Sequence, residues 1–472
     1  MRMANERVIV FGLGGKLSYE KKNKKEFYES LNVVNFCDNN AALIGTEYDG
    51  KKVIAPSDLS QCQFDRIIVA SNYYREIACQ LTHEGIDRTK IIHWDEYAVR
   101  DMHGQVTIYA PHCRAEGKSV LLISTTLGIN GGTVAAVNAA EALSRRGYAV
   151  SLCAKGANVD IVRQTTSKGI QVILCPAICY PDESELKWIK KYDYIIVNVY
   201  QMMRCANYIS QYRKIMWWIH ESGEKYCNIY PKIQSLFFEY CMEQYENINI
   251  YAVSNIAGRN FLKYHPRQDV DIITLGVAEQ AAGESEKGQT REKHIFAVIG
   301  AILPLKGQMD VLCAVEAMNR EGIKAQYEFW FIGKAGDPAY SRKVEEKAAL
   351  YPNVKLLGEV NMDSMRMLYR QIDTVICFSY EETMSLTVIE GMMNNKTCIT
   401  TNQTGIAEYI EDYKNGFICG VGDVGELAGK CKWILTHEQE CKSIAGNARR
   451  TYEEYFTLER LGSRLEKELL KL

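Results

Sequence analysis

The sequence lacks several features that would assign it to a specialised class of protein. Its formal net charge is only −2 over 472 residues, which argues against a nucleic-acid binder, because such proteins carry a strongly basic face. No run approaches the about 20 apolar residues needed to span a bilayer. The N-terminus, MRMANERVIVFG, has no apolar core of signal-peptide length. We therefore expect a cytoplasmic protein with no nucleic-acid partner, and peripheral contact with the inner face of the membrane stays open.

The cysteines form no recognisable metal or disulfide pattern. None of the 16 cysteines belongs to a Cys-x-x-Cys pair. Cys175 and Cys179 are the closest two, and no second pair or nearby histidine completes a metal set. We expect reduced, mostly buried thiols and no metal site.

What the sequence does contain is a long alternation of short apolar runs and polar stretches of helical period. Hydrophobic residues make up 47% and charged residues 24% of the chain, as in globular proteins, and the length indicates two or three domains. The alternation predicts an α/β fold of doubly wound sheets. We divide the chain into a small Rossmann-like domain (1–107), an α/β domain (118–277), a polar linker (278–293), a further α/β domain (294–456) and a C-terminal helix (457–472) that packs back across the hinge. Two such domains facing each other would enclose a deep cleft at the carboxyl ends of their strands.

The stretch EETMSLTVIE (381–390) holds two acids eight residues apart. The preceding DTVICFS predicts a strand, and a helix is expected from about Ser385 to Met393. Glu382 then lies at the carboxyl end of the strand, and the free N–H groups at the helix start form an anion site. Glu390 lies one to two turns into the helix, where its carboxylate suits the two hydroxyls of a ribose. The spacing alone would fit two surface charges equally well or better.

This stretch resembles the acid–seven–acid motif of glycosyltransferase family 4, the retaining nucleotide-sugar transferases of GT-B fold. The family form is E-G-F-G-L-x-x-x-E-A-M, and here it reads E-T-M-S-L-T-V-I-E-G-M. Both acids match, as do Leu386 and Met392. Met384 and Ser385 replace the Phe-Gly pair of the family, at positions that act largely through backbone N–H groups.

A second match is HIFAVIGAILPLKG, in which Lys306 and Gly307 fit the lysine and glycine of the family. Such a lysine would offset the charge of the departing diphosphate. Ala301 stands where the family has an arginine, so one cation is missing or comes from elsewhere. The alternative for Lys306 is an ordinary lysine at a helix start.

Three further matches keep the family order between about residues 118 and 460. Gly131 and Gly132 follow a strand and would let backbone approach the diphosphate, although any tight strand–helix turn could use them. His220 ends a buried strand, where the family often carries a histidine near the transferred sugar; a structural histidine is the equal alternative. Glu221 beside it would bind acceptor hydroxyls or be solvated. The run TNQTGIAEYIEDYKNG supplies Thr404, Gly405, Glu408, Asn415 and Gly416.

The resemblance implies transfer of a sugar from a nucleoside-diphosphate sugar to a hydroxyl of a carbohydrate or lipid-linked acceptor, with retained configuration, in surface polysaccharide or glycoconjugate synthesis. It implies no cofactor besides the nucleotide sugar as co-substrate, and no metal, because no Asp-x-Asp motif occurs in the segments expected to line the cleft. The catalytic residues it implies are His220, Lys306 and Glu382. The donor-binding residues it implies are Gly131, Gly132, Lys306, Glu382, Met384, Ser385, Leu386 and Glu390.

The N-terminal segment has a Rossmann-like pattern of its own. Gly12 and Gly14 follow a strand, and Asp38 ends the next one, which would suit a nucleotide ribose. The third glycine of the dinucleotide fingerprint is absent. The segment also resembles small sugar-nucleotide or CoA-binding-like domains of polysaccharide enzymes, and a docking domain without a nucleotide fits as well. The KKNKK run (21–25) predicts a solvated surface, with phosphate or membrane contact as the alternative.

Two other functions remain open at this point. A catalytically weakened transferase-like subunit that binds a partner transferase or a nucleotide sugar would explain Ala301 and the Met384-Ser385 change. An oxidoreductase or epimerase activity of the N-terminal domain is weakened as a prediction by the missing third glycine of the dinucleotide fingerprint.

Overall fold

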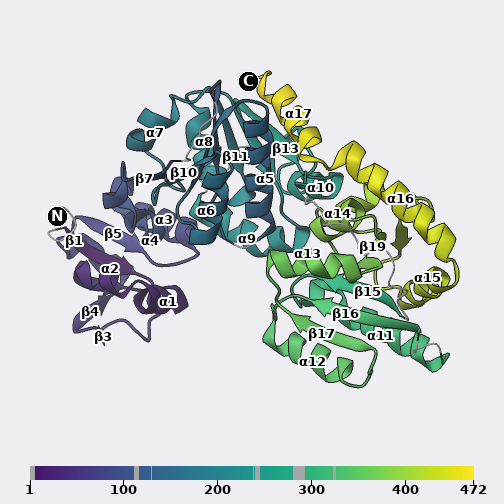
Figure 1. The fold of residues 1–472 in the computed structure, drawn as a ribbon. Helices are drawn as coiled ribbons and strands as arrows, with labels where there is room; N and C mark the ends of the chain where they lie inside the picture. The colour runs from purple at the N-terminus through teal and green to yellow at the C-terminus, as the bar shows by residue number, and fades with distance from the viewer. Residues whose placement is uncertain are drawn as a thin grey trace.

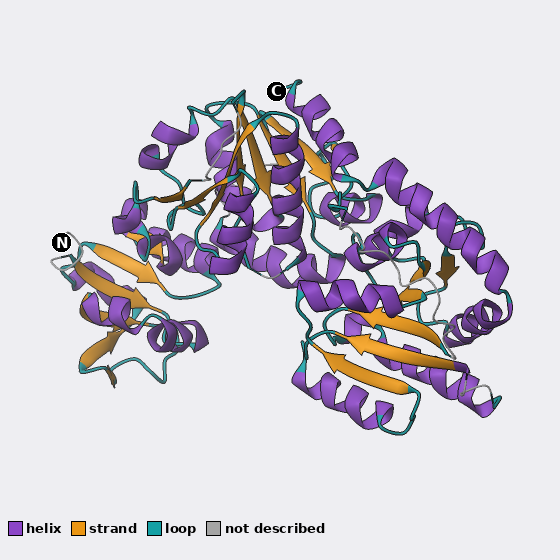
Figure 2. Cartoon of the chain, in the orientation of Figure 1, coloured by secondary structure: helices purple, strands orange, loops and turns teal. Residues whose placement is uncertain are grey.

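The computed structural model describes residues 6–110, 116–128, 130–237, 239, 245–279, 293–322 and 326–472. The chain forms three units that follow one another in sequence, each built on a predominantly parallel sheet with helices packed against it (Figures 1 and 2). The predicted α/β class with two facing Rossmann-like domains and a third, smaller one is confirmed. Most of the predicted linker, residues 280–292, lies outside the described residues.

The first unit is a six-stranded sheet in the order β3-β4-β2-β1-β5-β6, parallel except for the β3–β4 hairpin. In its central strand β1, Val8–Phe11 are buried because helices cover both faces, which is why these four residues are all apolar. The strands are β1 (Arg7–Phe11), β2 (Asn32–Cys37), β3 (Glu47–Tyr48), β4 (Lys51–Ile54), β5 (Arg66–Val69) and β6 (Ile91–His93). The α-helices are α1 (Gly15–Asn23), α2 (Lys25–Ser30), α3 (Tyr74–His83) and α4 (Trp94–Tyr97).

The second unit is an eight-stranded sheet in the order β14-β13-β12-β11-β8-β9-β10-β7. Its strands are β7 (Thr107–Tyr109), β8 (Ser119–Ile123), β9 (Ala149–Ala154), β10 (Gln171–Leu174), β11 (Tyr194–Asn198), β12 (Ile215–Ile219), β13 (Ile248–Ala252) and β14 (Val270–Ile272). Its helices are α5 (Gly131–Arg145), α6 (Val159–Ser167), α7 (Glu183–Ile189), α8 (Met203–Ser210), α9 (Gly223–Leu236) and α10 (Asn255–Leu262). The side chains of Asn130, Asp182, Ser222 and Ser254 cap α5, α7, α9 and α10, which fixes where these helices begin.

The third unit is a six-stranded parallel sheet in the order β17-β16-β15-β18-β19-β20. Its strands are β15 (His294–Ile299), β16 (Tyr327–Ile332), β17 (Val354–Gly358), β18 (Thr374–Cys377), β19 (Thr397–Thr401) and β20 (Phe417–Cys419). Its helices are α11 (Gln308–Arg320), α12 (Pro338–Ala348), α13 (Met362–Gln371), α14 (Leu386–Met393) and α15 (Val424–Thr436).

The C-terminal segment forms two helices where the sequence predicts one. Helix α16 (Glu438–Tyr455) packs on α14 and β19, and α17 (Leu458–Leu469) packs on α5 of the second unit (Figure 1). The break occurs where the N–H of Val277 donates to the carbonyl of Phe456 (2.8 Å) and Thr457 caps α17. The end of the chain therefore ties the second and third units together.

The segment between the first two units also differs from the prediction. We expected only a polar break there, whereas β7 pairs antiparallel with β10 and becomes the edge strand of the second sheet. The sequence gives no clear strand signal here, because β7 has only three residues and all of them are exposed. Among the described residues, no helix is both long and apolar enough to cross a bilayer.

Candidate active site

A cleft of about 480 Å³ opens between the second and third units, at the carboxyl ends of their strands. Of the predicted site residues, it is lined by Gly131, Gly132, His220, Lys306, Glu382, Met384 and Leu386. Ser385 and Glu390 are not among its lining residues, although both belong to the same loop and helix. Residues far apart in sequence thus converge on one cavity, as the family order requires.

The start of α5 forms one wall of the cleft. Oδ1 of Asn130 accepts the N–H of Thr133 (3.0 Å), and the buried Asn198 donates to the carbonyl of Gly132 (3.2 Å). A Cβ built on Gly131 would meet no atom within 4 Å, so this glycine faces open space in the cleft. Unpaired backbone N–H groups and the positive end of the helix dipole make this wall favourable for an anion.

The backbone beside this wall is strained. Val199 has a φ of 69°, a region that β-branched residues rarely adopt. Two contacts hold it there: Nε1 of Trp217 donates to its carbonyl (2.9 Å), and the N–H of Tyr200 donates to the carboxylate of Glu221 (3.0 Å). The Val199 side chain lies against Gly132 and lines the cleft. Strain of this kind is concentrated at functional sites.

Lys306 and Glu382 meet on the opposite wall. The Lys306 ammonium is ion-paired with Oε2 of Glu382, and the two side chains are 29% and 21% exposed. Burial opposes the charge on Lys306, but the attraction of Glu382 outweighs it and raises the pKa of the ammonium. Lys306 ends a short turn before α11, and Gly307 follows with a φ of 65°. A Cβ at Gly307 would lie 2.2 Å from the carbonyl oxygen of Phe378, which explains the Lys-Gly pair.

Helix α14 begins as predicted, with Ser385 as its N-cap. The Ser385 hydroxyl accepts the N–H of Val388 (3.4 Å) and is buried, so its role is to set the helix start. Glu390 lies deeper, and its Oε2 accepts a hydrogen bond from the Tyr369 hydroxyl (2.9 Å). Burial raises the pKa of Glu390, and the bond from Tyr369 opposes that rise.

His220 stands at the rim of the cleft. Its ring packs edge-on against Trp218, with 4.5 Å between ring centroids. Burial, together with the positive charge of Lys225, lowers the pKa of His220 to about 3, so the imidazole is neutral near pH 7. Its Nε2 is buried without a hydrogen-bond partner among the described residues. A neutral ring nitrogen of this kind suits a sugar hydroxyl.

Glu221 does not have the exposed position that the sequence suggested. Its side chain is 1% exposed, and its carboxylate accepts the N–H groups of Tyr200 and His220, both at 3.0 Å. Burial raises its pKa. Glu221 therefore fixes the backbone after β11 and after β12, both on the second unit, instead of being solvated.

The two domains are joined across the cleft by hydrogen bonds that the sequence analysis missed. Oε1 of Glu381 accepts from the N–H of Gly223 (2.5 Å) and from the amide of Asn260 (2.6 Å). Thr383 donates to the carbonyl of His220 (2.8 Å). We call Glu381 with Gly223 and Asn260 the interdomain clasp. Glu408 adds a further contact of the same kind, to Asn255 (2.8 Å).

Lys225 and Asn130 are the other site residues that the sequence analysis missed. Lys225 lines the cleft from α9, on the second unit. Its position in the first turn of a helix gave no signal, since lysine there is common on surfaces. Asn130 could have been found, because an asparagine before Gly-Gly and an apolar run is an N-cap signature.

The predicted residues of the N-terminal unit lie together, at the carboxyl end of β1. Asp38 accepts the N–H of Leu13 (2.7 Å) and of Asn40 (2.8 Å), one with each carboxylate oxygen. Gly12 has a φ of 99° and approaches the carbonyl of Ala70. Gly14 is the N-cap of α1. Asp38 thus holds the glycine turn beside it, and a nucleotide site here stays a prediction.

Three family models match the chain. Residues 282–451 match the model described as glycosyl transferases group 1, residues 116–277 match glycosyl-transferase family 4, and residues 4–92 match the model named C2185-like, N-terminal. The first two correspond to the units on either side of the cleft. The third corresponds to the small N-terminal unit.

Curated relatives are distant and match in part. N-acetyl-alpha-D-glucosaminyl L-malate synthase of Bacillus anthracis is 24% identical over 183 residues, which is 39% of this chain and 47% of that protein. Sulfoquinovosyl transferase SQD2 of Arabidopsis thaliana is 28% identical over 128 residues, 26% of this chain and 25% of that protein. The chain thus spans less than half the length of these relatives.

Solved structures share the fold over a longer stretch. The crystal structure of Anabaena Alr3699/HepE in complex with UDP and glucose superposes with a TM-score of 0.63 at 16% identity, over 75% of this chain and 100% of that one. WaaG, a glycosyltransferase involved in lipopolysaccharide biosynthesis, gives a TM-score of 0.55 at 16% identity, over 74% and 99%. The family models match the two units on either side of the cleft, one after the other in sequence. The chain therefore belongs to the family 4 type of glycosyltransferases with the GT-B fold, and it carries an additional N-terminal domain.

Proposed function

We propose that the protein is a retaining glycosyltransferase that moves a sugar from a nucleoside-diphosphate sugar to a hydroxyl acceptor in polysaccharide or glycoconjugate synthesis. The observation that carries the proposal is the convergence of Lys306 and Glu382 opposite the Gly131–Gly132 turn in one cleft. A cation, a carboxylate and a helix N-terminus are the groups that a sugar diphosphate requires.

The residues take the following roles in this proposal. Lys306 and the N–H groups at the start of α5 and α14 hold the diphosphate, and the cation stabilises the charge that develops on the leaving phosphate. Lys225 supplies a second positive charge from the other domain, which compensates for Ala301. These groups neutralise the diphosphate without a metal, so we expect chelators to leave transfer unchanged.

The donor sugar and the ribose would be held by the acids of the motif. Glu382 accepts hydrogen bonds from hydroxyls of the transferred sugar once Lys306 turns to the phosphate. The Glu390 carboxylate accepts hydrogen bonds from the ribose hydroxyls, either in place of the hydrogen bond from Tyr369 or in addition to it. His220, neutral and with a free Nε2, contacts the sugar at the acceptor side. The departing phosphate oxygen then takes the proton of the attacking hydroxyl on the same face of the sugar, which retains the configuration.

The first experiment is a donor screen with UDP-, GDP- and ADP-sugars, by calorimetry and by slow donor hydrolysis. The HepE structures with UDP and with UDP-glucose make UDP-sugars the first to test. Hydrolysis monitored by proton NMR reports the anomer that forms first, so an inverted first product would contradict the retaining mechanism. A donor that binds wild type and loses affinity for Glu390→Gln, with less effect for its 2′-deoxy analogue, supports the ribose contact.

A transferase-like subunit without its own activity is the alternative that Ala301 favours. In that case neither hydrolysis nor transfer would be measurable with any acceptor, whether or not a nucleotide sugar binds. Failure of every nucleotide sugar to bind the folded protein would contradict the transferase proposal and favour a subunit that binds a partner transferase.

A further inference from the structure

A second cavity of about 1,240 Å³ lies between the N-terminal unit and the second unit. It shares Thr125, Thr126 and Gln201 with the cleft, so the two cavities are adjacent. We call this cavity the acceptor groove. Its walls come from α1 and α2 on one side and from the loops after β8 and β9 on the other. A ligand in the groove would therefore lie next to the cleft, with these three residues between them.

The loops on the second unit are tied to one another. The N–H of Lys155 donates to the carbonyl of Thr125 (3.0 Å), and the N–H of Leu127 donates to the carbonyl of Gly156 (2.9 Å). Lys155 is exposed, and the described residues give its ammonium no ion pair. The backbone of Lys155 is therefore fixed beside Thr125, which lines both cavities, and its ammonium is accessible from the groove.

The N-terminal unit contributes the lysines of the KKNKK run. Lys22 is exposed and lines the groove, and no acid within the described ranges pairs with it. Lys24 is ion-paired with Glu20 (2.8 Å) and lies 3.6 Å from Asp95, so two acids of the groove are already neutralised. Glu26 also lines the groove. Lys22 and Lys155 thus offer unpaired positive charge from opposite walls.

Aromatic rings accompany these charges. Tyr19 is 64% exposed, although aromatic side chains are usually covered, and Phe27 and Tyr180 line the same groove. The Arg204 guanidinium lies 4.9 Å from the centroid of the Tyr180 ring, which fixes that ring in place. Aromatic faces beside a few charged groups are typical of a site for a ligand with both apolar and ionic parts.

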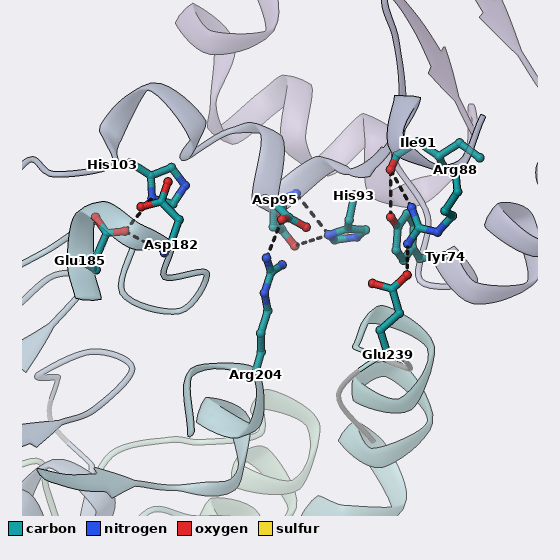
Figure 3. Close-up of polar contacts among 11 residues, drawn as sticks. Tyr74, Arg88, Ile91, His93, Asp95, His103, Asp182, Glu185, Arg204 and Glu239 are labelled. Carbon is teal, nitrogen blue, oxygen red and sulfur yellow. Dashed lines mark hydrogen bonds and ion pairs between the residues drawn. The ribbon is translucent and has the colours of Figure 1, made fainter. Parts of the chain in front are cut away.

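The N-terminal unit is docked rather than loosely attached, so the groove has a defined shape. Polar contacts cross the interface at several points. Arg88 pairs with Glu239 (2.8 Å) and His103 with Glu185 (2.7 Å), as Figure 3 shows. Arg204 pairs with Glu96 (2.5 Å). Asp95 lies close to this interface, where its carboxylate is also 3.7 Å from Nδ1 of the buried His93.

We propose that the N-terminal domain is an acceptor-recognition domain and that the groove binds a phosphorylated saccharide, with its phosphate between Lys22 and Lys155 and its hydroxyl directed past Gln201 into the cleft. The inference rests on the proposed transferase function and extends it, since it names the class of acceptor. A phosphate is favoured over a neutral glycan because two exposed ammonium groups on separate walls have no acidic partner among the described residues, and both attract an anion in the groove.

The test uses the full chain, with UDP at saturation so that the cleft is covered. The probes are glucose 1-phosphate, methyl glucoside as its uncharged counterpart, and farnesyl-diphosphate-linked N-acetylglucosamine in detergent micelles. Affinity is measured by calorimetry for wild type, Lys22→Ala and Lys155→Ala. Lys51→Ala is the matched control, because Lys51 is an exposed lysine on β4 of the same domain and does not line the groove.

We expect at least one phosphorylated probe to bind about 10-fold more tightly than methyl glucoside, and each groove variant to remove about 5- to 10-fold of that affinity. Lys51→Ala should behave as wild type. Tight binding of the soluble probe indicates a sugar phosphate, and tight binding of the micellar probe alone indicates a lipid-linked acceptor.

Equal affinity for charged and uncharged probes, or groove variants with unchanged affinity, would overturn the inference. UDP titrated alone separates this outcome from a failure of the transferase proposal. If UDP binds and the lysines have no effect, only the acceptor site is wrong. If UDP fails to bind, the donor site is wrong, and the phosphorylated probes are then titrated without it and decide the groove separately.

Discussion

Lys306 and Glu382, 76 residues apart in sequence, are ion-paired in the cleft between the two transferase domains. The sequence assigns one to the diphosphate and the other to the donor sugar. Their pairing means that neither is free until a ligand competes for it. Donor binding must therefore exchange a partly buried ion pair for contacts with phosphate and hydroxyl groups. Removing Lys306 and removing Glu382 should consequently have different effects on donor binding and transfer.

Glu382→Gln should separate binding from transfer. With its partner neutral, the Lys306 ammonium has an unsatisfied charge that a diphosphate can take, so affinity for UDP should stay constant or rise a few-fold. Transfer should fall by about 100-fold, because the contact with sugar hydroxyls is weakened. Lys306→Ala should instead lower UDP affinity by about 10-fold or more. Calorimetry and initial rates test both variants, with the exposed Glu345→Gln as control. A loss of UDP affinity in Glu382→Gln would contradict the exchange.

Gly131→Ala tests whether a ligand approaches the start of α5. A methyl group at this position meets no protein atom within 4 Å, so thermal stability should not fall. If a diphosphate lies on the N–H groups of this turn, the methyl group obstructs it and UDP affinity should drop by about 10-fold. Gly429→Ala, at an exposed position of α15 with an equally open environment, should keep UDP affinity and match or exceed wild-type stability. Unchanged UDP affinity in Gly131→Ala would place the diphosphate elsewhere.

Lys225→Met tests the second cation. Removing this charge should lower UDP affinity by about 3- to 10-fold. It should also raise the pKa of His220 from its value of about 3, since Lys225 contributes to that depression, although burial remains the larger cause. Proton NMR of the imidazole follows the pKa. Lys232→Met, at an exposed position on the same helix, is the control and should change neither quantity.

The sequence correctly predicted those parts of the site that depend on local sequence patterns. Three features of the site depend on residues close in sequence: the start of α14 at Ser385, the Lys306-Gly307 pair and the Gly131 turn. Each has a local sequence signal, which is a capping residue, a glycine in a left-handed conformation or a glycine at an exposed helix start. For Glu221 the solvated alternative was wrong, because its carboxylate accepts two backbone N–H groups, one of them from a separate loop, and local sequence does not show such a contact. Binding of acceptor hydroxyls by Glu221 stays a prediction. The acceptor groove could not be predicted at all, because it exists only where the KKNKK run faces the Lys155 loop after two domains have docked.

Glu381→Ala should loosen the closure of the cleft. Glu381 holds both the N–H of Gly223 and the amide of Asn260 in the interdomain clasp, so its removal leaves two donors from the second unit unpaired. We expect a larger radius of gyration in X-ray scattering and a higher KM for donor, with kcat reduced by less. Glu411→Ala, an exposed acid on the same unit, should leave all three unchanged. Unaltered scattering together with an unaltered KM would show that the clasp does not set the domain arrangement.

His103 and Glu185 should make docking of the N-terminal domain depend on pH. The hydrogen bond to Glu185 raises the pKa of His103 above its ordinary value of 6.5. Burial opposes ionisation of Glu185, but hydrogen bonds from His103 and the N–H groups of Gly104 and Asp182 prevail and lower its pKa to about 2. The histidine therefore stabilises the docked form below about pH 6.5 and ceases to do so as pH rises through its raised pKa. The carboxylate stabilises it above about pH 4.5 and ceases to do so as pH falls towards 2.

The contact is thus strongest between about pH 4.5 and 6.5, and this window can be measured. Wild-type minus His103→Gln stability, from urea unfolding at a series of pH values, should be largest in that window, on the order of 1 kcal/mol, and should shrink at higher pH. His83→Gln, at an exposed position of the same domain, should give a difference near zero throughout. If the acceptor groove depends on docking, the affinity for a phosphorylated saccharide should fall in His103→Gln at pH 6 and approach the wild-type value at pH 9. A difference in stability that grows with pH would mean that the neutral imidazole, and not the ion pair, holds the domain in place.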